Sequence, residues 1–511
     1  MQAELGPQFE LDWLKKWNMY SPKNLALTDG DTGESLTYSK LYELSKSGAF
    51  LLKNKYGIKK GDRVIHFCTN EISSFTLFFA LARLGATLVP INYRLTPREL
   101  CYVITNAEPS MIVYESGFEG LLTEIKDEIG VPESRWLLLT GENSFATSSA
   151  AEKSTFDEFA SDATTTAIII YTSGTTGFPK GAMISHQTLF WNSMNTTISI
   201  NVCETDAAVI FLPLFHTGGW NVLSTPFLHR GAHVILTKKF DAEQVLALSE
   251  KHKTTLLFGI PTTMGMMARS EKFESAHLKS LRYAIVGGEP MPLENIKVWQ
   301  KKGIPVRQGY GLTEFGPNVF SLNEAQSVRK MGSIGFPNFY VDVKVVDEKN
   351  QTLSHDQVGE LCLKGPMAMT GYWKNPKATA ETFEDGWLKT GDLVYFDQEK
   401  YFYVVGRKKD MYKSGGENVY PAELEQVIQQ LPWVRESAVI GVKDEQWGEV
   451  GHAFVSVKNE HFDEKELREH CLKNLAKFKN PKYFTRLPDL PKGDSGKILK
   501  RKLVDFVATA L

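Results

Sequence analysis

Residues 171–181 read YTSGTTGFPKG and directly follow the apolar run AIII at residues 167–170. A short run of β-branched residues that ends in turn residues is typical of a buried strand. Glycines let backbone N–H groups converge on an anion, while hydroxyls add donors and a lysine adds a point charge. The spacing is not that of a Walker A motif. The stretch therefore predicts a phosphate-binding loop, with a polar hairpin turn as the alternative. Its predicted ligand-binding residues are Thr172, Ser173, Gly174, Thr175, Thr176, Gly177 and Lys180.

Length and composition indicate a large globular protein without a polyanion-binding surface. The chain has 511 residues, 42% of them hydrophobic, which predicts about two to four domains or subdomains. A formal net charge of −2 and the lack of a nucleic-acid motif argue against a nucleic-acid partner. The five cysteines include no C-x-x-C pair, so neither a disulfide framework nor a zinc site is indicated, and a cytoplasmic protein is expected.

The sequence predicts neither a secretion signal nor a membrane span. The first residues lack a basic segment followed by an apolar one. The most apolar long stretch, residues 75–91, is interrupted by Arg83 and Pro90 and falls short of a membrane-spanning helix. Peripheral contact with a membrane and a homodimer are left open.

Strand and helix patterns alternate in the first 165 residues. Strands are predicted at 62–67, 86–90 and 111–114, and helices from residue 36 onward, at 75–84 and at 97–106. Such alternation predicts a largely parallel sheet covered on both faces. Residues 139–166 are polar and are predicted to be a loose connection.

Two later stretches carry groups suited to a ligand site. Residues 211–220, FLPLFHTGGW, read as an apolar strand that ends in His216, two glycines and Trp220, which could gate a hydrophobic pocket. Residues 306–314 read VRQGYGLTE. Tyr310 can stack on a base, Thr313 can bind a phosphate, and Glu314 offers the hard oxygen that Mg²⁺ prefers.

The C-terminal part reads as a separate small domain. Residues 332–397 predict a small β-rich subdomain, and GRKKD at 406–410 looks like a boundary. Pro421 suits a first helical position, and the rest of the chain reads helix, strand, strand, helix, strand. From Lys473 to Lys502 there are ten basic and two acidic residues. This run is either a solvated face or a surface for the phosphates of coenzyme A.

These motifs resemble, in the same order, those of the adenylate-forming superfamily, in particular its acyl-CoA synthetase branch. The resemblance covers roughly residues 30–502 and implies an α/β fold. It implies a large N-terminal domain of layered α/β subdomains with a small β-rich subdomain at residues 1–405. A hinge at 406–410 and a small mobile α+β domain at 411–511 would follow.

The resemblance also implies roles for individual residues. Besides the loop, the nucleotide would contact Gly288, Glu289, Pro290, Gln308, Gly309, Tyr310, Gly311, Thr313, Asp392, Arg407 and Lys497. The implied catalytic residues are Lys497, Thr172, Lys180, His216 and Glu314, of which Glu314 would bind the metal. The acid would contact His216, Gly219, Trp220, Gly287 and Gly311; Lys413, Gly415 and Gly416 would line a coenzyme A channel, and Lys409 would be the hinge.

The implied activity is a two-step ligation that uses ATP, Mg²⁺ and coenzyme A. A carboxylic acid would first become an acyl-adenylate, and coenzyme A would then displace AMP. No acidic residue occurs at 215–222, where amino-acid-activating relatives place one, so a fatty acid is favoured. An aryl acid, such as a coumarate or a succinylbenzoate, is the alternative. Transfer of the acyl group to a carrier protein, luciferase-like use of oxygen, and a non-catalytic binding protein are further alternatives. No carrier domain is expected after residue 511.

Overall fold

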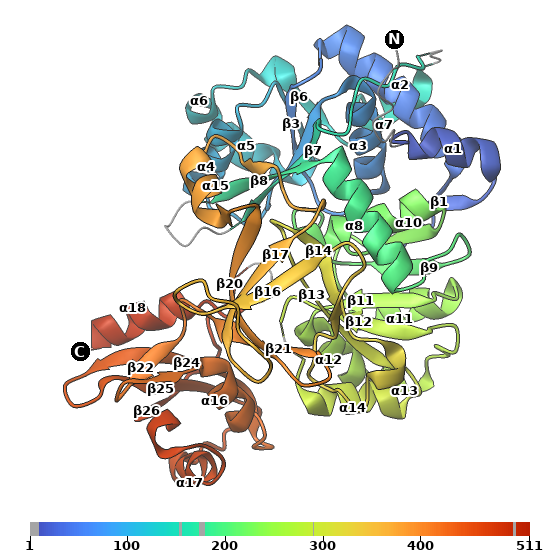
Figure 1. Cartoon of the computed structure of the whole chain (residues 1–511). Helices are drawn as coiled ribbons and strands as arrows, with labels where there is room; N and C mark the ends of the chain where they lie inside the picture. Colours follow the sequence, from blue (N-terminus) through green and yellow to red (C-terminus); the bar gives the residue numbers. More distant parts are fainter. Residues whose placement is uncertain (1–9, 153–155, 173–178, 290, 494–496, 511) are drawn as a thin grey trace, which may run out of the picture.

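The computed structural model describes residues 10–152, 156–172, 179–289, 291–493 and 497–510 (Figure 1). A large domain comes first in the chain, and a small domain, orange to red in Figure 1, follows it. The mixed α/β fold and this division into a large and a small domain agree with the predicted fold class.

A seven-stranded sheet lies at the centre of the first part of the chain, in the order β18-β8-β7-β4-β3-β5-β6. Strands β3 to β7 are parallel, and β8 and β18 are added antiparallel at one edge. Side chains alternate between two cores, since Val64 and Ile168 lie in one and Ile65 and Ile169 in the other. The prediction of a parallel sheet covered on both faces is therefore confirmed. The strands are β3 (Arg63–Phe67), β4 (Thr87–Pro90), β5 (Met111–Tyr114), β6 (Trp136–Leu138), β7 (Thr166–Thr172), β8 (Lys180–Ser185) and β18 (Gly371–Tyr372).

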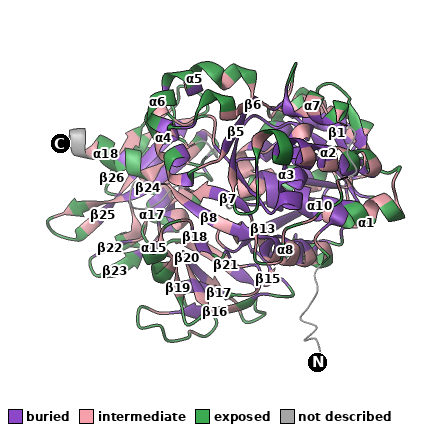
Figure 2. Cartoon of the chain, turned by 90° about the horizontal axis from the view of Figure 1, so that it is seen from above, coloured by how far each residue is buried: buried purple, intermediate pink, exposed green. Residues whose placement is uncertain are grey.

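Helices cover both faces of this sheet, and their caps explain where they begin. Thr96 and Glu99 form a reciprocal capping box with Pro97 in the first turn of α4. Helix α3 is buried on nearly every side, which accounts for the apolar stretch at 75–91. Figure 2 shows the buried strands inside and the exposed helices α5 and α6 outside. Across the described residues, no helix is both long and apolar enough to span a membrane. The helices are α2 (Tyr38–Tyr56), α3 (Ile72–Leu84), α4 (Pro97–Ala107), α5 (Glu119–Glu124) and α6 (Lys126–Ile129).

Two more sheets complete the α/β part, in the orders β2-β1-β10-β9 and β11-β12-β13-β14-β15. A separate core, which includes the fully buried Trp299, lies between the second of these sheets and its helices. The strands are β1 (Leu25–Asp29), β2 (Ser35–Thr37), β9 (Ala207–Ile210), β10 (His233–Leu236), β11 (Leu256–Gly259), β12 (Tyr283–Val286), β13 (Val306–Leu312), β14 (Gly316–Ser321) and β15 (Phe336–Pro337). The helices are α8 (His186–Ser199), α9 (Thr217–Asn221), α10 (Ser224–Arg230), α11 (Ala242–Lys251), α12 (Pro261–Arg269), α13 (Glu271–Ser275) and α14 (Leu293–Lys301).

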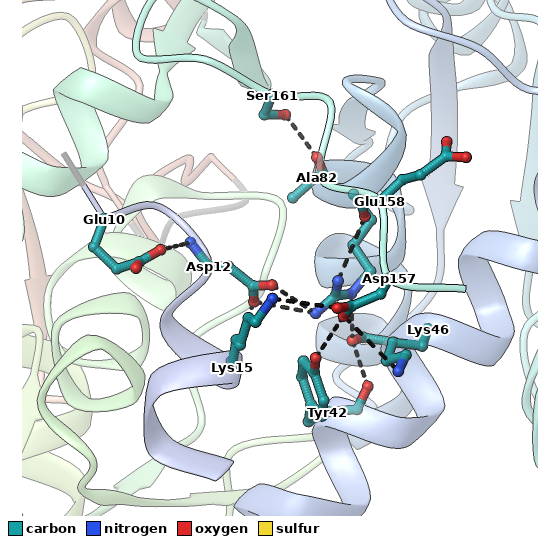
Figure 3. Close-up of polar contacts among 11 residues, drawn as sticks. Glu10, Asp12, Lys15, Tyr42, Lys46, Ala82, Asp157, Glu158 and Ser161 are labelled. Atoms are coloured by element: carbon teal, nitrogen blue, oxygen red, sulfur yellow. Dashed lines mark hydrogen bonds and ion pairs between the residues drawn. The ribbon is translucent and has the colours of Figure 1, made fainter. Parts of the chain in front are cut away.

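The first helix, α1 (Trp13–Tyr20), is fastened to the large domain by a buried ion pair (Figure 3). Arg83 is 1% exposed and its guanidinium lies 2.9 Å from a carboxylate oxygen of Asp12. Beside this pair the Tyr42 hydroxyl donates to Asp157 at 2.8 Å. Removing one partner of such a buried pair would leave an uncompensated charge, so the contact holds α1 in place.

Residues after β15 form the predicted β-rich subdomain. Its antiparallel sheet has the order β16-β17-β20-β19, with β21 paired to β20. The short β18 leaves this sheet and joins the edge of the seven-stranded sheet instead. The elements are β16 (Asp342–Val346), β17 (Gly359–Lys364), α15 (Pro376–Thr382), β19 (Phe383–Glu384), β20 (Trp387–Phe396) and β21 (Phe402–Arg407).

The small C-terminal domain has its own sheet, β23-β22-β25-β24 with β26 on β25, and its own two cores. Helices α16 and α17 pack in one core and α18 in the other. The predicted order of helix, strand, strand, helix, strand is found as α16, β24, β25, α17 and β26, and Pro421 opens α16 as predicted. The strands β22 and β23 before α16 and the helix α18 after β26 were not predicted. The elements are β22 (Tyr412–Ser414), β23 (Glu417–Val419), α16 (Pro421–Ile428), β24 (Val434–Asp444), β25 (Gly448–Val457), α17 (Glu464–Asn474), β26 (Tyr483–Arg486) and α18 (Lys500–Ala510).

Two local predictions need correction. The segment 139–166 is not only a loose connection, because Ser144 and Thr147 form a reciprocal cap that starts α7 (Phe145–Ala151). In the segment 211–220 the strand β9 has already ended at Ile210, and the glycines belong to the short helix α9.

Candidate active site

The predicted phosphate-binding loop joins two paired strands. Thr172 ends β7 and Lys180 begins β8, and the two residues are cross-strand partners. The Thr172 hydroxyl lies 3.3 Å from Oε1 of Glu314. Ser173, Gly174, Thr175, Thr176 and Gly177 lie outside the described residues. The Thr172 end of the loop thus lies at Glu314, which is 142 residues away in sequence, and Lys180 is paired with Thr172.

Glu314 lies in the turn between β13 and β14, at the end of the VRQGYGLTE stretch, next to Thr313. Its Oε1 accepts a hydrogen bond from the Tyr372 hydroxyl at 2.9 Å in addition to that from Thr172. The Lys180 ammonium lies 5.3 Å from the centroid of the Tyr372 ring. Among the described residues there is no group of three or more His, Cys, Asp and Glu side chains that could hold a metal alone. A lone carboxylate fits Mg²⁺, which is usually bound through one or two carboxylates together with substrate phosphates.

A second cluster surrounds Asp392 on β20. The Tyr310 hydroxyl donates to its Oδ2 at 2.6 Å, and Nε of Arg407 lies 2.7 Å from its Oδ1. Burial raises the pKa of Asp392, although Arg407 and Tyr310 oppose the rise. Burial also raises the pKa of Tyr310, so this hydroxyl keeps its proton and donates. Tyr310, Asp392 and Arg407, which are all predicted to contact the nucleotide, are therefore neighbours.

Lys497 reaches this region from the small domain. A Cβ built on Gly288 would lie 3.9 Å from the Cε of Lys497. The side chain of Lys497 is exposed to solvent, but many protein atoms lie around its ammonium. This partial removal from water lowers the pKa of Lys497, and the charge of Glu289 opposes the shift. The charges of Arg407 and Asp392 also act on the pKa of Lys497. The structure thus brings a residue of the last strand–helix connection next to the Gly287–Glu289 turn, whose Pro290 lies outside the described residues.

His216 occupies the N-cap position of α9 but makes no side-chain capping hydrogen bond. Helix α9 carries Gly219 and Trp220. Burial, together with the charges of Lys497 and Arg94, lowers the pKa of His216 to about 4, so the ring is neutral at pH 7. Among the described residues, its buried Nε2 has no hydrogen-bond partner. A neutral imidazole with one unpaired buried nitrogen is suited to a polar group that arrives with a substrate.

The remaining predicted acid-binding residues differ in their surroundings. Trp220 is fully buried and packs on Phe75 and Phe78, with ring centroids 4.8 and 5.4 Å away. A Cβ on Gly219 would collide with the carbonyl of Pro213, so this position admits only glycine. Trp220, which was predicted to contact the acid, is therefore part of the hydrophobic core, and its place in an acid pocket stays a prediction.

Glycine is equally required at Gly311, where a Cβ would collide with the backbone of Pro317. Gly309 pairs with Ser321 in the β13–β14 ladder, and a Cβ on Gly287 would touch the ring of Phe258. Backbone and side-chain atoms therefore pack closely against the glycines on either side of Tyr310. Gln308 is buried and its Oε1 accepts the N–H of Met291 at 3.0 Å, which makes it a support of the turn.

The predicted coenzyme A channel lies on a hairpin of the small domain. Gly415 and Gly416 form the two-residue turn between β22 and β23, with φ of 61° and 87°, as a type I′ turn requires. The backbone N–H of Lys413 donates to Glu449 and its ammonium lies 3.9 Å from Glu348. None of the described contacts of this hairpin is with Glu314, Asp392 or His216. Lys409 is exposed in the turn that follows β21, between the two domains.

Two buried residues of the site were not predicted as site residues. Tyr372 stood in the sequence as part of a GYW triplet, without a role. Asn70 carried no signal at all, yet its amide donates to the carbonyls of Leu212 and Thr237 and accepts the N–H of Leu214 at 2.9 Å. Asn70 thereby fixes the segment that leads to His216, across 144 residues of sequence.

Comparison with known proteins shows extensive similarity. The family model described as AMP-binding enzyme matches residues 14–373, and that described as AMP-binding enzyme C-terminal domain matches residues 423–497. A feruloyl-CoA synthase of Amycolatopsis sp is 35% identical over 96% of this chain and 97% of its own length. The long-chain-fatty-acid–CoA ligase FadD13 of Mycobacterium tuberculosis (strain H37Rv) is 34% identical over 94% of this chain and 95% of its own length.

Solved structures are similar as well. The o-succinylbenzoate CoA synthetase MenE of Bacillus subtilis, solved with the acyl-adenylate intermediate OSB-AMP, is 30% identical over 96% of this chain and 97% of its own, with a TM-score of 0.86. MenE has also been solved with ATP and a magnesium ion, with a TM-score of 0.87, 30% identity and coverage of 97% and 99%.

Proposed function

The chain belongs to the family of AMP-binding enzymes, as the resemblance of its motifs predicted, and on this premise we propose that it is an AMP-forming acid–coenzyme A ligase. The carboxylate of the acid attacks the α-phosphorus of ATP, pyrophosphate leaves, and an acyl-adenylate forms. The thiol of coenzyme A then loses its proton, attacks the acyl carbon and displaces AMP. Relatives that match nearly the whole chain and bear CoA-ligase names support this proposal.

The observation that carries the proposal is the convergence of three groups from three parts of the chain. Glu314 with Thr172 and Lys180 forms a phosphate and metal end, and Asp392 with Tyr310 forms a nucleoside end. Lys497 lies next to the turn at Gly288, within electrostatic reach of Asp392. A nucleotide bound across the two ends would present its α-phosphate to the ammonium of Lys497.

Each residue then has a role in the first half-reaction. Lys180 and Lys497 stabilise negative charge that develops on the phosphates and the attacking carboxylate. His216 stays neutral and offers its free ring nitrogen to the acid, while Asp392 holds the ribose. When bound through Glu314, Mg²⁺ supplies Lewis-acid neutralisation of the phosphates.

The second half-reaction requires another orientation of the small domain. Lys497 lies next to Gly288, while the described contacts of the hairpin of Lys413, Gly415 and Gly416 are with other residues. We propose that the domain, residues 411–511, rotates about the turn at Lys409 and brings the hairpin to the acyl-adenylate. Domain closure of this kind is a common way to use one site for two steps.

The acid that we propose has an apolar body. No acidic residue occurs at 215–222 that could bind an α-amino group, and the side chains of Phe215 and Trp220 are aromatic. A long-chain fatty acid and an aryl acid are both candidates, because relatives with either kind of name match nearly the whole chain at similar identity, 35% and 34%. Cytoplasmic location, a homodimer and peripheral membrane contact stay predictions.

A panel of acids tests the activity. Purified protein with ATP and Mg²⁺ is assayed for acid-dependent exchange of pyrophosphate into ATP, with ferulate, succinylbenzoate and palmitate as representatives. The same mixtures with coenzyme A are analysed by mass spectrometry, and a thioester is expected. Accumulation of acyl-adenylate without any thioester would overturn the ligase assignment in favour of transfer to a carrier protein, and no exchange with any acid would overturn adenylation itself.

A further inference from the structure

We propose that Tyr372 is a positioning residue for adenylation: its hydroxyl orients Glu314 toward the metal and its ring holds Lys180 at the phosphates. This inference rests on the proposed function and adds a residue that connects the two ends of the phosphate-binding loop to the metal ligand. The inference is based on two contacts of the Tyr372 side chain, one with Glu314 and one with Lys180.

The hydroxyl contact determines which oxygen of Glu314 is available. Tyr372 donates to Oε1 at 2.9 Å, and the Thr172 hydroxyl approaches the same oxygen at 3.3 Å. Two hydroxyls on one carboxylate oxygen fix the rotation of the carboxylate and direct Oε2 to another partner. Tyr372 is 9% exposed, and burial raises the pKa of its hydroxyl, so it remains a donor throughout the physiological range.

The ring contact concerns Lys180. Its ammonium lies 5.3 Å from the centroid of the Tyr372 ring, within the range of a cation–π interaction. A lysine side chain has four rotatable methylene carbons, so a ring beneath its ammonium reduces the number of conformations it samples. Removing the hydroxyl alone leaves this contact intact, and the two contacts can therefore be tested separately.

The backbone around Tyr372 is held firmly at the edge of the large sheet. Tyr372 pairs with Ala182, and the N–H of Trp373 donates to the carbonyl of Gly181 at 2.8 Å. The indole N–H of Trp373 donates to the carbonyl of Asn106 at 2.9 Å. The two-residue strand β18 therefore delivers Tyr372 to β8, the strand that Lys180 begins.

Groups that hydrogen-bond to metal ligands typically contribute about 10- to 100-fold to metal affinity or activity. Tyr372→Phe should accordingly raise the Mg²⁺ concentration needed for half-maximal pyrophosphate exchange by about 10- to 100-fold. The exchange rate at saturating Mg²⁺ should recover toward the parent value. Tyr372→Leu, which also removes the ring, should lower the rate at saturating Mg²⁺ as well, because Lys180 loses its support.

Two further measurements separate positioning from a structural role. Isothermal titration with ATP in Mg²⁺ and in EDTA, without acid, should show that Tyr372→Phe loses mainly the Mg²⁺-dependent part of the affinity. Tyr38→Phe is the matched control, because Tyr38 is fully buried, lies outside the site and donates to the carbonyl of Ala232 at 2.7 Å. The thermal midpoint of Tyr38→Phe should fall by about as much as that of Tyr372→Phe. The Mg²⁺ dependence of ATP binding and of exchange by Tyr38→Phe should stay that of the parent.

The outcomes distinguish this inference from the proposed function. If the parent protein shows no acid-dependent exchange, the proposed function fails. If the parent is active and Tyr372→Phe has the Mg²⁺ dependence of Tyr38→Phe, the inference about Tyr372 is overturned. In a Glu314→Gln background, Tyr372→Phe should cause little further loss of Mg²⁺-dependent ATP affinity, and full additivity of the two losses would also overturn it.

Discussion

Asp392→Asn should reduce the preference of the enzyme for ATP over 2′-deoxy-ATP. The variant keeps the size of the side chain but replaces one acceptor oxygen by an NH₂ donor. If Asp392 accepts the two adjacent hydroxyls of the ribose, one of those hydrogen bonds is lost. The 2′-hydroxyl should therefore raise the kcat/KM of the variant much less than it raises that of the parent.

The magnitude follows from how the carboxylate is already used. An ionised carboxylate has about four acceptor positions. Tyr310 takes one on Oδ2 and Arg407 takes one on Oδ1, which leaves about one on each oxygen for the ribose. A hydrogen bond to a charged group contributes about 1.5–3 kcal/mol, which corresponds to about a 10- to 150-fold loss in kcat/KM for ATP. Arg407 is half-exposed, so water can solvate its guanidinium in the variant and the fold should be little affected.

The assay compares kcat/KM for ATP and 2′-deoxy-ATP in acid-dependent pyrophosphate exchange, for the parent, Asp392→Asn and a control. Asp397→Asn is the matched control, because Asp397 belongs to the same subdomain and also contacts a tyrosine hydroxyl and an ammonium, those of Tyr403 and Lys330. Asp397→Asn should prefer ATP over 2′-deoxy-ATP as strongly as the parent does. If Asp392→Asn discriminates between the two nucleotides as strongly as the parent does, the carboxylate does not bind the ribose.

Three further predictions follow from other parts of the structure. Lys497→Ala should lose adenylation by about 100-fold or more, yet should convert presynthesised acyl-adenylate to thioester at near the parent rate; an equal loss in both half-reactions would contradict the domain rotation. Trp220→Ala should lower the free energy of unfolding by about 3–5 kcal/mol because the side chain is fully buried, and should shift preference toward bulkier acids; denaturant titration and the acid panel measure the two effects, and an unchanged acid profile would remove Trp220 from the pocket wall. The pKa of His66 and of His216 is lowered to about 4 by burial, so the unfolded chain binds more protons and stability should fall as the pH drops from about 6.5 to about 4, by up to about 3 kcal/mol per histidine. His66→Gln should flatten this pH dependence in equilibrium unfolding, and a slope equal to that of the parent would show that His66 is not its source.

Much of the fold could be predicted because the relevant signals are local. The run at 167–170 lies in β7, and the stripe of Leu424, Ile428 and Leu431 packs in the core of the small domain. Helix starts also carry a local signal, a side chain that accepts the backbone N–H three residues on, as Asp241 does at α11 and Asp463 at α17. Neither helix start has a reciprocal capping box, because the side chains three residues on bond elsewhere: Gln244 to Asp31 and Glu466 to Trp433.

Local patterns were misleading where the polar composition hid a capped helix. Residues 139–166 look like a linker by composition, but Ser144 starts α7, and Phe145 is fully buried. A helix cap needs only one or two side chains, so in a sequence with many serines and threonines the capping residues cannot be told from the others. Similarly, the glycines of residues 217–221 suggested an open strand end, whereas they permit α9 to pack against the carbonyl of Pro213.

The sequence by itself determined the order of the elements, the residue types available for phosphate, metal and ribose, and the family, because strand and helix periodicity, capping and motif spacing act over a few residues. Only the tertiary structure decided which of these groups meet. Lys497 lies at Gly288 because the small domain is oriented that way, and Tyr372 reaches Glu314 because a two-residue strand joins a distant sheet edge. Such contacts join residues tens to hundreds of positions apart, and they depend on loop closure and packing that no local pattern encodes.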